Sequence, residues 1–274
     1  MEQTQTLEVL ICTINENIRK IPDVLIAERP DVKYLVSWQQ TGTVTTPLEL
    51  PEALNQRKDV KVEILEGRGL APNRNNALKH ATGDILLLSD DDTRYKDEYF
   101  DRILHNFRKY PKADFICFRA VDKDGNFLRQ YATEPFTYSQ RPKGTFFCSV
   151  EIAFRRKLSI PFFDERFGLG SKYLAGGEEE VFLHTAFQKG LKIIFVPETI
   201  VETDPNTTGK RFRTLASMRR TKGAVLCYIY GPMSAAARCL KFAMMQDCDL
   251  KTKWHYYQDM LAGIRYIRDG HIDK

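Results

Sequence analysis

Three consecutive carboxylates, Asp90, Asp91 and Asp92, lie in the segment SDDDT directly after the apolar run ILLL at residues 85–88. Adjacent carboxylates repel one another, so a turn that holds them together is costly unless a cation or a donor-rich ligand lies there. A hard divalent cation that keeps coordination positions for phosphate oxygens meets that need. The alternative is a solvated turn that caps the next helix. We favour metal or phosphate chemistry, because the acids stand at the end of an apolar strand.

A second acidic run, Glu178, Glu179 and Glu180, opens a predicted helix in the segment GGEEEVFL at residues 176–183. Glu178 and Glu179 each precede a large apolar residue by four positions, so both are predicted to lie on the buried face. Glu180 aligns instead with polar residues further along the helix. The alternative is a helix start that is enriched in acids because of the helix dipole. That alternative accounts for Glu180 and explains two inward glutamates poorly.

The segment GRGLAPNRNNAL at residues 67–78 carries glycines and Arg68, which are suited to approach a phosphate, and Arg74 in the first turn of a helix. It lacks the G-x-x-x-x-G-K-[ST] pattern of a phosphate-binding loop, and G-x-G alone is a weak signal. A P-loop enzyme or a dinucleotide-binding fold is therefore disfavoured.

Alternating strands and helices must position these residues. Strands are expected over residues 7–13, 32–38, 60–65, 84–89, 114–121 and 192–197, and helices over residues 15–28, 72–80, 97–110 and 178–189. A turn is expected at residues 122–126, a core strand around Cys148, and only helices beyond Thr214. This alternation predicts a largely parallel sheet with helices on both faces. Such sheets bind ligands at the carboxyl ends of their strands, where the acidic cluster lies.

The composition of the 274-residue chain is that of an ordinary globular protein, with 43% hydrophobic and 28% charged residues. No apolar run approaches the roughly 20 residues that span a bilayer. The acidic, polar N-terminus does not resemble a signal peptide. Six scattered cysteines without a C-x-x-C pair predict reduced thiols in the cytosol.

The net charge of +5 is unevenly distributed. From Thr207 to the end, 13 Lys/Arg stand against 5 Asp/Glu, a net charge of +8. A basic end indicates a surface that meets phosphates, nucleic acid or the cytoplasmic face of a membrane. A solvated helical face is an equally good interpretation of the same residues.

Several motifs in this order resemble one enzyme family. They are TIN at residues 13–15, RNNAL at 74–78, ATGDILLLSDDDT at 81–93, and GGEEEVFLHTAFQKGLKIIFVPETIVET at 176–203. Together they resemble the family 2 inverting glycosyltransferases of GT-A fold, of the bacterial polysaccharide-biosynthesis type. The resemblance covers roughly residues 7–212. It implies a GT-A-like nucleotide-sugar-binding and catalytic domain over residues 1–212, with a mostly parallel sheet flanked by helices. Residues 213–274 would form a basic helical extension that is not an independent domain.

The resemblance also implies roles for individual residues. Asp92 would hold Mn²⁺ or Mg²⁺ on the donor diphosphate, and Glu179 would take the place of the catalytic aspartate in the family's E-D pair. Glu178 would support the acceptor or the helix start. The donor nucleotide would contact Thr13, Asn15, Trp38, Arg74, Asp90 and Asp91.

Three positions depart from the family pattern. Where the second strand usually ends in an acidic residue, this chain has Trp38 and Gln39, and Trp38 stacks on the base or belongs to the core. Where many relatives have a metal-ligating histidine, it has Thr203 followed by Asp204. Either Asp204 substitutes as a ligand, or Asp92, phosphates and water hold the metal. Glu179 in place of the family's catalytic aspartate also makes the side chain of the base longer by one methylene.

The implied reaction moves a sugar from a UDP-linked nucleotide-diphosphate sugar to a glycan or lipid-linked acceptor hydroxyl, with inversion. We expect a cytoplasmic enzyme with peripheral contact to anionic membrane on its inner face, and no nucleic acid partner. One alternative is a haloacid-dehalogenase-like phosphatase, but Arg94 stands where that motif requires Thr or Val. The other is a non-catalytic nucleotide- or glycan-binding module.

Overall fold

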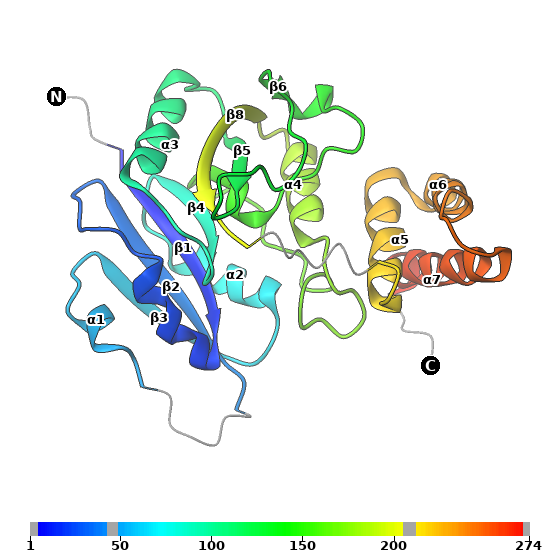
Figure 1. Ribbon diagram of the computed structural model, residues 1–274, viewed down its shortest axis with the longest axis horizontal. Helices are drawn as coiled ribbons and strands as arrows, with labels where there is room; N and C mark the ends of the chain where they lie inside the picture. The colour runs from blue at the N-terminus through cyan, green and yellow to red at the C-terminus, as the bar shows by residue number, and fades with distance from the viewer. Residues whose placement is uncertain (1–4, 43–48, 205–211, 271–274) are drawn as a thin grey trace. The chain divides into compact units, whose positions relative to one another are not determined.

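The computed structural model describes residues 5–42, 49–204 and 212–270, which follow the predicted order of strands and helices (Figure 1). The chain forms two compact units, and each consists of three segments that are separate in the sequence. The first unit consists of Met1–Arg68, Pro72–Phe162 and Thr185–Pro205. The second consists of Gly69–Ala71, Phe163–His184 and Asn206–Lys274. The predicted boundary at residue 212 stays a prediction.

Within the described residues the first unit contains an eight-stranded sheet of order β3-β2-β1-β4-β7-β5-β8-β6. The strands are β1 (Leu7–Ile14), β2 (Val32–Gln40), β3 (Val60–Glu66), β4 (Ile85–Asp90), β5 (Phe115–Val121), β6 (Phe136–Thr137), β7 (Ile152–Arg155) and β8 (Ile193–Glu202). The pairs β1–β2, β1–β4, β2–β3 and β5–β8 are parallel. Strand β7 runs antiparallel between β4 and β5, and β6 runs antiparallel to β8. The prediction of a mostly parallel sheet is confirmed.

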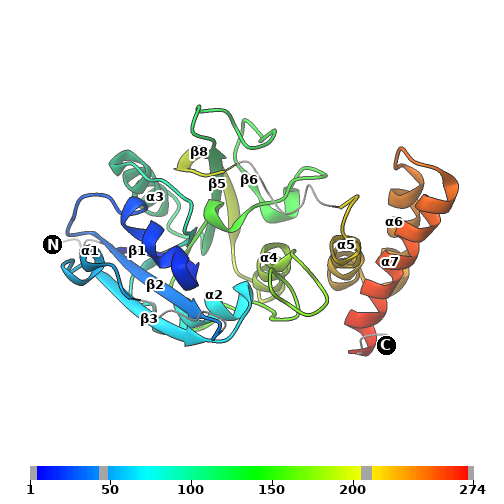
Figure 2. The same ribbon diagram turned by 60° about the horizontal axis from the view of Figure 1, so that its bottom comes forward.

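Helices cover both faces of this sheet (Figures 1 and 2). The α-helices are α1 (Glu52–Asn55), α2 (Leu70–His80), α3 (Asp97–Lys109), α4 (Glu178–Gln188), α5 (Ala216–Tyr230), α6 (Pro232–Met244) and α7 (Leu250–Asp269). Helix α3 packs on one face, where Phe100 meets the ring of Tyr34 edge-on at 6.4 Å. On the opposite face of β2, Ser37 accepts a hydrogen bond from Asn76 of α2 at 2.8 Å. Side chains of alternating direction along β2 therefore contact different helices.

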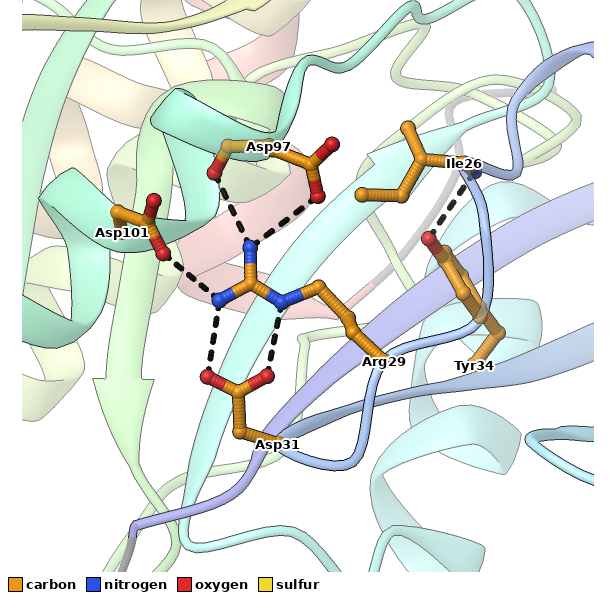
Figure 3. Close-up of polar contacts among 6 residues, drawn as sticks. All are labelled: Ile26, Arg29, Asp31, Tyr34, Asp97 and Asp101. Atoms are coloured by element: carbon orange, nitrogen blue, oxygen red, sulfur yellow. Dashed lines mark hydrogen bonds and ion pairs between the residues drawn. The ribbon is translucent and has the colours of Figure 1, made fainter.

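An ion-pair cluster around Arg29 holds the loop before β2 to the start of α3 (Figure 3). The guanidinium donates to both carboxylate oxygens of Asp31 at 2.8 and 2.9 Å. It also reaches Asp101 at 2.7 Å and Asp97 at 3.3 Å, both on α3. The hydrogen bonds to Asp31 raise the pKa of Arg29. The planar fork of arginine suits such a multiple contact better than a lysine would.

Two local predictions are wrong. The helix expected over residues 15–28 is a 3-10 helix, η1 (Asn15–Asp23), that contains Pro22, which cannot donate a backbone hydrogen bond. The core strand expected around Cys148 begins only at Ile152, and residues before it form the 3-10 helix η3 (Ser149–Glu151). The Glu151 carboxylate accepts from the Cys148 amide at 2.9 Å, which favours a turn over an extended backbone there. A third 3-10 helix, η2 (Tyr138–Gln140), follows β6.

The second unit is built on α5, α6 and α7, so the prediction of helices beyond Thr214 is confirmed for the described residues (Figure 1). Helices α5 and α7 cross at two glycines that allow backbone to meet backbone. A Cβ added at Gly223 would lie 1.9 Å from the Met260 carbonyl oxygen, and one at Gly263 would lie 1.9 Å from that of Arg220. No helix within the described residues has the length and apolarity needed to cross a lipid bilayer.

Candidate functional site

The carboxyl ends of β1 and β4 are joined by a direct side-chain contact. The Thr13 hydroxyl, at the end of β1, donates to Asp91 at 2.8 Å, and the Thr13 carbonyl accepts from Asn73 of α2 at 3.0 Å. Burial raises the pKa of Asp91, while the Thr13 hydroxyl and the Lys20 ammonium 3.9 Å away oppose that rise. Parallel strands end at one edge of the sheet, so these predicted donor-site residues meet as expected.

Asn15 connects the end of β1 to the end of β2. Its backbone has a φ of 47°, a left-handed conformation that asparagine tolerates better than most residues. Its amide accepts from the Thr41 amide and donates to the Thr41 hydroxyl, both at 3.0 Å. Its carbonyl accepts from the Trp38 indole at 2.9 Å. These contacts give Asn15 a structural role at this edge.

Trp38 is 3% exposed and belongs to the hydrophobic core of the first unit. Of the two alternatives for this residue, the structure favours the core. A flat contact with a nucleobase requires an exposed ring face, which this indole does not offer.

Arg74 is fully buried on α2, with a guanidinium nitrogen 3.4 Å from Asp90. It belongs to a run of four buried polar residues, Asn73 to Asn76, at the end of the sheet that carries the acids. Buried polar side chains are costly unless they are hydrogen-bonded, so a run of them indicates a preorganised polar site. The positive charge of Arg74 balances the negative charge of Asp90. The negative charges of the neighbouring Asp91 and Asp92 are less fully balanced.

Asp90 has a second partner that sequence reasoning missed. The Ser149 hydroxyl, in η3, donates to the other Asp90 carboxylate oxygen at 3.2 Å. Helix η3 is held in place by Glu151, which is fully buried and accepts from Arg129 at 2.9 Å and from the Tyr131 hydroxyl. The sequence offered one signal for this network, a glutamate within the apolar segment TFFCSVEIAF.

Asp92 differs from its two neighbours, because no cation pairs with it among the described residues. Its pKa is raised by burial first and then by the negative charges of Asp90, Asp91 and Asp204. The Thr203 hydroxyl lies 3.5 Å from it. Asp204 is exposed at the end of β8. An under-compensated carboxylate beside further carboxylates has the charge and the oxygen donors that a hard divalent cation requires.

The described residues contain no group of three or more His, Cys, Asp or Glu side chains arranged to hold a metal ion. A cation that takes one or two protein carboxylates and completes its shell with phosphate and water oxygens does not require such a group.

The second acidic run, at the start of α4, lies in the second unit. Glu178 is 3% exposed, and its carboxyl lies against Gly168, where an added Cβ would be 3.1 Å from the carboxyl carbon. Glu179 and Glu180 are both half-buried. The predicted burial of Glu178 is confirmed, but burial does not separate Glu179 from Glu180.

The sequence profile of glycosyl transferase family 2 matches residues 9–175, more than half of the chain. The chain belongs to glycosyl transferase family 2. It is therefore an enzyme that transfers a sugar, and the alternatives of a phosphatase and a non-catalytic module are set aside. A comparison with curated protein sequences gives no match.

Solved structures of S. aureus TarS are similar to this glycosyltransferase. TarS 1–349 has a TM-score of 0.60 at 15% identity, covering 97% of this chain and 92% of that chain. Its complex with UDP-GlcNAc has a TM-score of 0.60 at 16% identity, covering 95% and 72%. Its complex with UDP has a TM-score of 0.57 at 17% identity, covering 96% and 72%. The predicted GT-A-like α/β fold with a helical C-terminal region is confirmed.

One pocket of the glycosyltransferase lies away from the acids. It has a volume of about 560 Å³ and is lined by residues before β5 and at the start of β8, including Ala113, Ile193 and Ile194. These are the amino ends of the strands, whereas Asp90 is the last residue of β4, and Asp91 and Asp92 follow it. The position of this pocket therefore does not fit the donor site of the family.

Proposed function

We propose that this glycosyltransferase uses a nucleotide-diphosphate sugar, UDP-linked, and transfers its sugar with inversion to a glycan or lipid-linked acceptor hydroxyl. The observation that carries the proposal is the under-compensated Asp92 beside Asp90 and Asp91 at the carboxyl end of β4. Donor binding at strand ends is typical of parallel α/β sheets. The complexes of TarS with UDP and UDP-GlcNAc support the choice of donor.

Asp92 would hold Mn²⁺ or Mg²⁺, with Asp204 as a second oxygen donor. A bound divalent cation would supply Lewis-acid stabilisation of the departing diphosphate. Asp90 would contact the nucleoside or ribose, and Asp91 would support it through Thr13. In this proposal Arg74 acts through Asp90, because its guanidinium is fully buried beside that carboxylate.

Glu179 would act as the general base. A half-buried carboxylate near the acceptor can take the hydroxyl proton as that oxygen attacks the anomeric carbon from the face opposite the diphosphate. Glu178 would position the start of α4, since its buried carboxyl lies against Gly168. Correct placement of donor and acceptor would contribute a large part of the rate.

We extend the proposal to the location of the enzyme. Described residues 212–270 carry 10 Lys/Arg and 4 Asp/Glu, which supports peripheral contact with an anionic membrane on its cytoplasmic face. A lipid-linked acceptor of bacterial polysaccharide biosynthesis would be presented there.

The test is an assay of nucleotide release from a panel of sugar nucleotides, with and without glycan or lipid-linked acceptors and with and without a chelator. We expect acceptor-dependent release of UDP from one or a few UDP-sugars, and an inverted anomeric configuration in the product. Release that is confined to another nucleotide would overturn the UDP assignment. Transfer with retention would overturn the role of Glu179, because a single displacement inverts the anomeric carbon.

A further inference from the structure

Large apolar side chains are exposed at the end of the second unit where α6 passes into α7. Met245 is 72% exposed, Leu250 73% and Trp254 52%, and Met244 and Leu240 are exposed as well. Exposed apolar residues that occur singly are ordinary, but a contiguous patch marks a surface that binds another protein, a membrane or a ligand.

The spacing of these residues makes the patch continuous. On α6, Met233, Leu240 and Met244 follow one another at intervals of seven and four, so they lie along one side of the helix. On α7, Leu250 and Trp254 are one turn apart. Met244, Leu250 and Trp254 line one surface hollow together with Lys251. This hollow connects the apolar residues of α6 with those of α7. Figures 1 and 2 show α6 and α7 joined by a short turn at this end.

Basic residues stand beside the apolar ones. Lys251 follows Leu250 and Lys253 precedes Trp254, so each lysine is displaced by about 100° around α7 from its apolar neighbour. Lys241 has the same relation to Leu240 on α6. Lysines in this position extend their charged ends past the apolar layer while their methylene chains cover it. A tryptophan beside them is typical of the boundary between lipid headgroups and acyl chains.

Two acidic residues lie in the turn, and they do not remove this positive character. Asp249 is the N-cap of α7, and its carboxylate accepts a hydrogen bond from the Thr252 amide at 3.0 Å. Asp247 is exposed. Residues 238–254 keep four basic residues, Arg238, Lys241, Lys251 and Lys253, against these two acids.

We propose that the α6–α7 end inserts Met244, Met245, Leu250 and Trp254 into the headgroup region of an anionic bilayer, with Lys241, Lys251 and Lys253 on the lipid phosphates. This inference rests on the proposed peripheral location and names the element that makes the contact. A second copy of the chain fits less well, because a two-fold contact over this patch would bring the same lysines towards one another. Anionic headgroups balance their charge instead.

The sequence supplies a built-in reporter for the test. The chain has two tryptophans, and Trp38 is 3% exposed while Trp254 is 52% exposed. A blue shift of intrinsic fluorescence on adding vesicles therefore reports Trp254 entering an apolar environment. The full-length chain is mixed with vesicles of phosphatidylglycerol and phosphatidylcholine, or of phosphatidylcholine alone. Co-sedimentation is measured in parallel.

We expect co-sedimentation and a blue shift with the anionic vesicles only, both reduced by high salt. Leu250→Ser should weaken vesicle affinity roughly ten-fold, because the leucine side chain that would be buried in the lipid is lost. Lys251→Gln should weaken it roughly five-fold, as expected for one basic residue at an anionic surface. The matched control is Leu158→Ser, since Leu158 is a fully exposed leucine of the first unit and should leave affinity unchanged.

The outcomes separate this inference from the location on which it rests. Co-sedimentation without a blue shift means contact through charge alone, which overturns insertion and leaves the peripheral location standing. No co-sedimentation at low salt overturns both, while the assay of sugar transfer tests the enzyme independently. If light scattering finds a dimer that Leu250→Ser dissociates, and vesicles do not bind, the patch is a contact between copies and the inference is wrong. Thermal melts of the variants confirm that each is folded.

Discussion

The two acidic runs of this glycosyltransferase contain three carboxylates each, and the backbone distributes them differently. At the end of β4, Asp90 contacts Arg74 and Ser149, while Asp91 contacts Thr13. Asp92 lies near Thr203 and has no cation partner among the described residues. Asp90 is the last residue of β4, and Asp91 and Asp92 lie in the turn that follows it. Because the chain changes direction there, each aspartate reaches a different element.

At the start of α4 the three glutamates share the first turn of the helix. Only Glu178 is buried, and Glu179 and Glu180 are half-buried. Successive helical residues differ by about 100°, and the first turn is flanked by the preceding loop rather than by a full helical face. Roles at the strand end can therefore be assigned from distinct partners, whereas roles at the helix start must be separated by experiment.

The largest expected effect separates the glutamates. Glu179→Gln keeps the size of the side chain but cannot accept a proton, so kcat should fall by roughly 10²–10⁴-fold, the usual contribution of a general base. The Kd of the donor should stay nearly unchanged. Glu180→Gln should change kcat little and stability within about 0.5 kcal/mol. Steady-state kinetics and donor titration measure these quantities.

Glu178→Gln serves as the control for a purely structural effect at the same helix start. We expect an intermediate loss of activity accompanied by a lower melting temperature, because the buried carboxyl packs against Gly168. If Glu180→Gln were inactive and Glu179→Gln active, the base assignment would be wrong.

The next effect tests whether the strand-end acids have different roles. Asp92→Asn should lower kcat by roughly 10²–10³-fold, by analogy with the loss of one strong electrostatic contact in other active sites. Adding Mn²⁺ in excess should restore part of the activity, since a weaker ligand set still binds the cation at high concentration. Asp204→Asn should have a smaller effect, because Asp204 is exposed at the end of β8. Full activity of the natural enzyme in excess chelator would contradict the metal assignment.

Much of the sheet was predictable because its strands are apolar runs bounded by clear turn residues. Strand β4 and the acids after it were placed from ILLLSDDD alone. The contacts of Asp90 with Ser149 and of Asp91 with Thr13 join residues 59 and 78 positions apart. Sequence periodicity carries no information about such long-range hydrogen bonds. The turn at Cys148 was missed because it depends on a carboxylate, Glu151, that looked like a core position.

Glu151 gives a pH-dependent test of the network behind Asp90. Burial raises its pKa from 4.5 to about 7, although Arg129, Tyr131 and the Cys148 amide oppose the rise. The folded state then binds this proton more tightly than the unfolded state, so the stabilising contribution is complete below pH 4.5 and is lost as pH rises towards 7. Between these values the free energy of unfolding should fall by about 1–3 kcal/mol more in the natural enzyme than in Glu151→Gln. Urea unfolding at several pH values measures the difference, and parallel pH curves would contradict it.

The smallest expected effect concerns Ser149, and it sharpens the comparison because it touches one carboxylate of the strand-end run and none of the others. Ser149→Ala removes the hydroxyl that donates to Asp90 at 3.2 Å, while Arg74 still pairs with the same carboxylate. One hydrogen bond of this kind contributes about 0.5–1.5 kcal/mol, so the donor KM should rise a few-fold to about ten-fold while the metal dependence of kcat stays unchanged.

Ser149→Thr keeps the hydroxyl and should recover much of the donor affinity, provided that η3 accommodates one more methyl group. Ser139→Ala is the matched control, since Ser139 is exposed in η2 and lines the pocket at the amino ends of the strands, away from the acids. If Ser149→Ala changed the apparent affinity for Mn²⁺ and left the donor KM unaltered, Asp90 and Asp92 would act as one metal-binding group. The separate roles inferred for Asp90 in donor binding and for Asp92 in metal binding would then be wrong.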